Sequence, residues 1–199
     1  MKAPKVPKAK TWVTSGFIQP RVKAGDYKVV LIKGKQKYEY PFKVEYDKES
    51  PYSPQDRKLQ YETTMKLYDL LQDLAYTVYQ MEQYKNYCDN MDDKYKTGLM
   101  KSVEQIEELR KKSVVTTGDN YVGMAEPRLR EKMSKLFGDV AGYYGAPSNA
   151  QLANLKSLIK QYDKLENKWK GIKTKCDKKI EKYNLPPVEM KEFDDFIVN

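Results

Sequence analysis

An apolar seam runs through residues 152–180 and constrains the fold more than any other feature of the chain. Its members alternate three and four positions apart, at Leu155, Leu158, Tyr162, Leu165, Trp169, Ile172 and Cys176. This heptad spacing predicts one long helix in a left-handed bundle, because the seam then faces its neighbours along its whole length. Such a narrow seam fits two partner helices.

The partner helices are predicted earlier in the chain. Ser53-Pro54 is a typical helix start, with serine as the cap and proline at the first helical position. The apolar spacing predicts a helix from there to Met91, and two shorter helices at 94–112 and 128–144. Short connections favour antiparallel neighbours, so we expect three long rods with the middle one broken. The fold class is α+β, mainly α.

A small antiparallel β unit is expected before the helices, within residues 12–46. Apolar residues alternate with polar ones from Tyr38 to Tyr46, which indicates a half-buried strand. We expect three or more strands, because a two-stranded hairpin alone is marginally stable and must pack on something or be completed. The favoured interpretation is that Tyr38, Tyr40 and Tyr46 pack this unit onto the first helix; the alternative is an exposed face for protein contacts.

Four segments are therefore predicted. They are a flexible basic arm at 1–11, the β unit at 12–50, the helical bundle at 51–184, and an extended C-terminal tail at 185–199 that packs back. No stretch approaches the run of about 18 apolar residues that spans a bilayer, so we expect no membrane span. The first residues have no apolar core of a secretory signal, which favours either a cytosolic protein or a fragment of a longer chain.

The chain has no histidine, which excludes histidine-dependent triads and most zinc sites. We therefore expect no catalytic, cofactor-binding or metal-binding residues and no enzymatic activity. A hydrolase that uses two carboxylates is an alternative, although Glu107-Glu108 and Asp194-Asp195 have the pattern of solvated charges. The net charge of +9 comes mostly from dispersed lysines. This pattern favours a solvated surface over a nucleic-acid or polyanion site, which stays an alternative.

The two cysteines are expected to meet. Cys88 and Cys176 fall near the same end of the first and last rods, which run parallel in the three-rod arrangement. The preferred interpretation is a disulfide that clips this end and implies an oxidising compartment. Two small buried apolar side chains are the alternative.

Several motifs resemble a known family. "VKAGDYKVVLIKGKQKYEYPFKVEYD", "SPQDRKLQYETTMKLYDLLQDL" and "FGDVAGYYGAPSNAQLANLKSLIKQYDKLENKW" are similar to the C-terminal region of secreted or periplasmic Bacteroidetes proteins with sortilin-like (BNR-like, "glycosyl hydrolase") β-propellers. Ala24 and Lys48 stand where the family usually has proline. The resemblance implies an immunoglobulin-like β unit on a helical stalk, located in the periplasm or outside the cell, with any hydrolase activity in absent propellers. The expected function is a non-enzymatic accessory or interaction module whose partner is a protein: its own propellers or another envelope protein.

Overall fold

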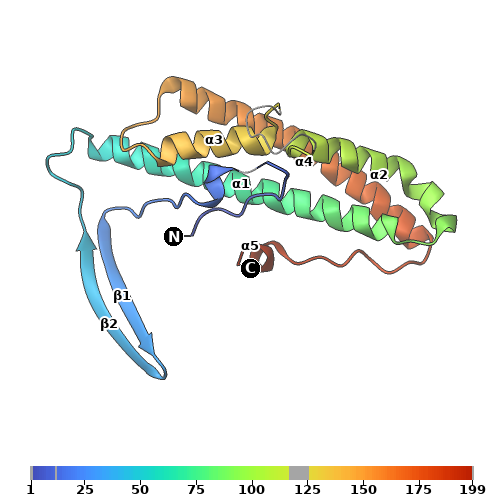
Figure 1. Ribbon diagram of the computed structural model, residues 1–199, viewed down its shortest axis with the longest axis horizontal. Helices are drawn as coiled ribbons and strands as arrows, with labels where there is room; N and C mark the ends of the chain where they lie inside the picture. Colours follow the sequence, from blue (N-terminus) through green and yellow to red (C-terminus); the bar gives the residue numbers. More distant parts are fainter. Residues whose placement is uncertain (1, 12, 117–125, 199) are drawn as a thin grey trace.

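A computed structural model describes residues 2–11, 13–116 and 126–198 and shows a mainly helical α+β molecule (Figure 1). A two-stranded antiparallel sheet near the N-terminus precedes a helical bundle, as the predicted fold class requires. The long helices of the described part are α1 (Pro54–Asp89), α2 (Asp93–Ser113), α3 (Leu129–Ala141) and α4 (Asn149–Lys182). The expected interruption between α2 and α3 falls largely on residues 117–125, outside the described residues.

The two longest helices begin at capping boxes. The Asp56 N–H donates to Ser53 Oγ at 3.1 Å, and the Ser53 N–H donates back to the Asp56 carboxylate at 3.0 Å. Ser148 and Gln151 repeat this exchange at the start of α4. Each box satisfies N–H groups that have no partner inside the helix, so it fixes the residue at which the helix starts.

Three rods form the bundle, and the middle one is broken. Hydrogen bonds join Thr77 to Tyr162 at 3.0 Å, and Gln80 to Trp169 at 2.9 Å, so α1 and α4 run in the same direction. The helices α2 and α3 make the return rod; Gln60 Nε2 near the start of α1 donates to the Val140 carbonyl near the end of α3, at 2.8 Å. The predicted three-rod arrangement is confirmed.

The bundle core is continuous and contains the whole seam of α4. Every predicted seam residue is buried, and Trp169 is only 1% exposed. Its ring meets the Tyr84 ring edge-on, with centroids 5.3 Å apart. Aromatic side chains of this size dominate core energetics, so the seam holds α4 against its neighbours within the molecule.

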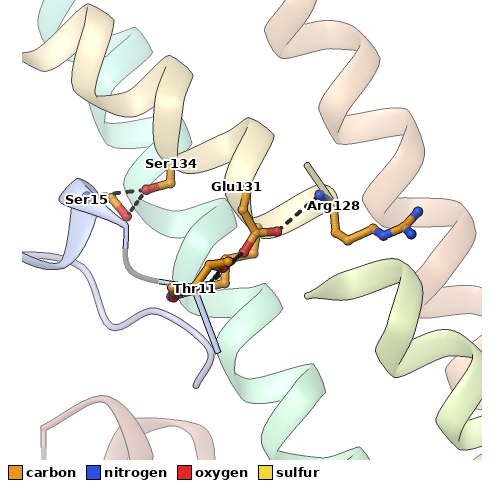
Figure 2. Close-up of polar contacts among 6 residues, drawn as sticks. Thr11, Ser15, Arg128, Glu131 and Ser134 are labelled. Carbon is orange, nitrogen blue, oxygen red and sulfur yellow. Dashed lines mark hydrogen bonds and ion pairs between the residues drawn. The ribbon is translucent and has the colours of Figure 1, made fainter. Parts of the chain in front are cut away.

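The N-terminal arm lies along the bundle instead of forming a free flexible segment (Figure 1). Pro4 and Pro7 are buried, and the Lys10 N–H donates to the Val115 carbonyl. Figure 2 shows Thr11 against Glu131 of α3, and the Thr11 hydroxyl donates to that carboxylate at 3.0 Å. The arm is ordered because its apolar residues cover the bundle and its backbone finds partners there.

The chain also returns to the bundle at its C-terminal end. Leu185, Val188 and Met190 pack against the core, and the short helix α5 (Phe193–Val198) follows. Its Phe196 ring stacks on Tyr79 of α1, with centroids 4.8 Å apart. The tail therefore shields part of its apolar side chains from water.

The β unit is smaller than predicted. It consists of β1 (Gly25–Lys33) and β2 (Gln36–Val44), joined by a turn in which Gly34 has a positive φ of 58°. The described residues before Gly25 add no third strand, so the prediction of three or more strands is wrong. A short 3-10 turn, η1 (Thr14–Gly16), lies there instead, with Ser15 buried against Ser134 of α3 (Figure 2). These two strands alone do not make the immunoglobulin-like unit that the resemblance implies.

Candidate interaction surface

One face of the hairpin is mostly apolar, and its polar side chains, Lys33 and Gln36, lie at the turn end. The strand register places Tyr27 opposite Phe42, Val29 opposite Tyr40, and Leu31 opposite Tyr38. Side chains two apart on a strand share a face, so these residues form one continuous surface. We call it the hairpin apolar face: Tyr27, Val29, Leu31, Tyr38, Tyr40 and Phe42.

Solvent covers this face in the described part of the chain. Tyr40 is 73% exposed and Leu31 is 61% exposed. Neither strand packs against any helix that the structure describes, and the hairpin extends away from one end of the bundle (Figure 1). Contiguous exposed apolar surface is unusual on soluble proteins and is typical of interaction sites.

The opposite face of the hairpin carries paired charges that are exposed to water. Glu39 accepts ion pairs from Lys28 at 2.6 Å and from Lys37 at 2.7 Å. The hydrogen bonds from Lys28 and then from Lys37 lower the pKa of the Glu39 carboxyl group. The two faces therefore differ: one carries paired charges beside the exposed Val30 and Ile32, and the other is the hairpin apolar face.

A cluster of arginines and tyrosines anchors the base of the hairpin. The Arg57 guanidinium of α1 lies 4.9 Å from the Tyr144 ring centre and 5.7 Å from that of Tyr46, which follows β2. Arg21, which precedes β1, contacts the same tyrosine: its guanidinium lies 3.7 Å from the Tyr144 ring centre. Cation–π contacts of this kind tie both ends of the hairpin to the bundle.

The tyrosine interpretation was only partly correct. Tyr46 does meet α1 through Arg57, as predicted. Tyr38 and Tyr40 do not pack on the first helix, because the strands leave the bundle before these residues are reached. The alternation in the sequence located the strand but did not show that its apolar side would be uncovered.

The predicted disulfide is not formed. Cys88 and Cys176 are free thiols, both buried in the core. Burial, and after it the charge of Cys176, raises the pKa of Cys88 to about 12. Burial also raises the pKa of Cys176. Both therefore act as small apolar core side chains, which was the alternative interpretation.

Two acidic side chains on α1 have raised pKa values that the sequence did not indicate. Burial raises the pKa of Asp69, and burial followed by repulsion from Asp69 and Glu166 raises that of Asp73.

The described residues contain no group of three potential ligands placed to hold a metal ion. They also contain no helix that is long and apolar enough to cross a membrane.

Comparisons with protein-family models, curated proteins and solved structures gave no match to this chain.

Proposed function

We propose that this chain is a non-enzymatic interaction module in which the helical bundle presents the hairpin apolar face to a protein partner. The observation that carries this proposal is the exposure of five of the six side chains of that face, all but the half-buried Tyr27, on a hairpin with no packing against the described helices. Three of its six side chains are tyrosine or phenylalanine on one strand, β2. Aromatic side chains are enriched at the centres of protein interfaces, where they bury large areas at low entropic cost.

Rigidity is the mechanism. The parallel rods α1 and α4 are locked by the buried seam, and the arginine–tyrosine cluster ties the hairpin to the start of α1. A partner that covers the hairpin apolar face gains hydrophobic free energy without having to order the bundle first. Because the bundle that supports the hairpin is already ordered, less entropy is lost on association.

The resemblance supports a specific setting for this module. On this resemblance we propose that the chain is part of a secreted or periplasmic protein with sortilin-like propellers, and that the partner is those propellers or another envelope protein. An isolated hairpin is marginal, which also favours a partner that completes or covers the sheet. The net charge of +9 lies outside the apolar face, so charge steers the encounter while the aromatic side chains provide the contact.

Site-specific photo-crosslinking in the source cells tests the proposal. A photo-reactive amino acid replaces Tyr40 in one variant and Met100 of α2, which is 59% exposed, in the control. We expect one discrete adduct from Tyr40, recovered from a periplasmic or secreted fraction, and no such adduct from Met100. The same adducts from both positions, or none from Tyr40, would overturn the proposal.

A charge substitution gives the matched loss-of-function variant. Leu31→Lys places a cation on the hairpin apolar face next to Tyr40, at the end nearer the turn, whereas Ile32→Lys places it on the opposite, charged face. The Tyr40 adduct should disappear with Leu31→Lys and persist with Ile32→Lys. Loss with both variants would show that the hairpin, and not its apolar face, is required.

A further inference from the structure

A second surface on the bundle has a different chemistry from the hairpin. Two adjoining grooves run between α4 and the return rod, with volumes of about 290 and 440 Å³. They share Leu109, Lys112 and Lys168, so they form one continuous channel along α4. From Gln161 to Lys175 this channel is about 21 Å long at 1.5 Å per helical residue.

The channel is strongly basic. In the described part of the chain, six cations line it against the single carboxylate of Glu108; the cations are Lys112, Arg128, Lys132, Lys164, Lys168 and Lys175. Arg128 pairs with Glu126 at 3.0 Å. Among the described residues, none of the five lysines forms an ion pair, although lysines elsewhere on the same helix, such as Lys170 and Lys173, do. Like charges collected in this way repel one another and attract a multivalent anion.

The other lining residues narrow the class of ligand. The floor is aliphatic, from Leu109, Leu165 and Ile172, and among the described residues no aromatic side chain lines either groove. Single-stranded nucleic acids are usually held by stacking their bases on aromatic rings, so this channel lacks what they need. The lysine ammonium group is a point charge, whereas the planar guanidinium of arginine binds a phosphate group through two hydrogen bonds at once.

Amide side chains complete the lining. Gln105 and Asn167 face one groove and Gln161 the other, and each offers a donor and an acceptor beside the lysines. Hydroxyl groups need partners of both kinds, and sulfate or carboxylate groups need cations. An aliphatic floor suits the apolar side of a sugar ring.

We propose that this channel binds an acidic polysaccharide, a sugar chain that carries sulfate or carboxylate groups. The ligand lies along α4, with its anionic groups on the lysines and its hydroxyls on the amides. The site is separate from the hairpin apolar face, so a chain whose hairpin is altered still binds the polysaccharide.

Affinity for a heparin-derived oligosaccharide, measured by calorimetry at low and physiological ionic strength, tests this inference. The channel variant is Lys112→Gln/Lys164→Gln/Lys168→Gln, and the matched control is Lys66→Gln/Lys101→Gln/Lys191→Gln. Both lower the net charge by the same amount at exposed positions without an ion pair among the described residues. Because three exposed charge contacts are lost, the channel variant should bind roughly tenfold more weakly, and the control should bind nearly as the parent.

Three outcomes would overturn the inference. Equal weakening in both triple variants would show that only the net charge matters. Binding of a thymidine oligonucleotide or of inorganic polyphosphate at least as tight as that of the sugar, and equally sensitive to the channel variant, would assign the channel to phosphate chains. Absence of measurable heparin binding at low ionic strength, with the fold intact by circular dichroism, would show that the channel holds no polyanion.

Discussion

Replacing Trp169 by alanine is expected to remove a large part of the stability of the bundle. The indole is 1% exposed, meets Tyr84 edge-on and donates a hydrogen bond to Gln80 at 2.9 Å. Truncating a buried tryptophan costs about 3–5 kcal/mol, through lost burial and the cavity that remains. Native domains are stable by about 5–15 kcal/mol, so Trp169→Ala should leave the chain folded but fragile.

Urea unfolding followed by far-UV circular dichroism measures this loss. With a slope of about 2 kcal/mol per molar urea, the midpoint should fall by roughly 2 M. Gly171→Ala is the matched control on the same helix, because an added Cβ there meets nothing within 4 Å. That substitution should stabilise the helix by about 0.5–1 kcal/mol. A loss below about 1 kcal/mol for Trp169→Ala would refute the claim that the seam is the centre of an intramolecular core.

Three further predictions concern the thiols, the buried acids and the hairpin. Cys88 and Cys176 should resist a thiol reagent at pH 8 in the native protein and both react in denaturant, because burial keeps them protonated; fast native reaction, or no thiols after denaturation, would contradict this. The raised pKa of Asp73 means that its favourable contribution is present below the unfolded value of 3.8 and is lost as the pH rises through the folded pKa. Asp73→Asn should therefore stabilise the protein at pH 7 by less than about 1 kcal/mol, seen as a higher melting temperature, and should give no gain near pH 3. A lower melting temperature of this variant at pH 7 would contradict the prediction. Leu31→Lys with Tyr40→Lys should shift the unfolding free energy by at most about 0.5 kcal/mol per site, because neither side chain packs on a described helix; a loss of several kcal/mol would mean that the face is packed in solution.

The helical part of the fold could be predicted because its signals are local and periodic. The seam from Leu155 to Ile172 has one period over many turns, and Ser53 and Ser148 mark the helix starts with cap chemistry. Matching rod lengths then left one simple arrangement. Residues that recur every three or four positions share one helix face, so the buried residues of α4 could be identified from the sequence alone.

The β unit shows where this reasoning stops. Alternation at Tyr38 and Tyr40 predicts a strand with two unlike faces, and both properties hold. Whether the apolar side is covered depends on packing between distant segments, which a period of two does not encode. The third strand was expected because two strands are marginal alone, but the segment around Ser15 gains more by packing on α3.

The basic channel was missed for a related reason. Lys112, Lys132 and Lys168 are far apart in the sequence and lie among acidic residues, so the lysines appeared evenly dispersed. The bundle brings them to one groove because α2 and α3 pack on the same side of α4. The i, i+4 spacing of Lys164 and Lys168 was the available sequence signal, since such residues share a helix face.

Hydrogen exchange of the hairpin amides tests the central claim most directly, first in the purified chain and then with the partner captured from Tyr40. The account predicts that residues 27–42 exchange far faster than the core of α1 around Leu74 in the chain alone. Adding the partner should slow exchange in the hairpin and leave α1 unchanged. Hairpin amides as protected as α1 without a partner, or protection by the partner that falls only elsewhere, would contradict the claim that the hairpin apolar face is a docking surface.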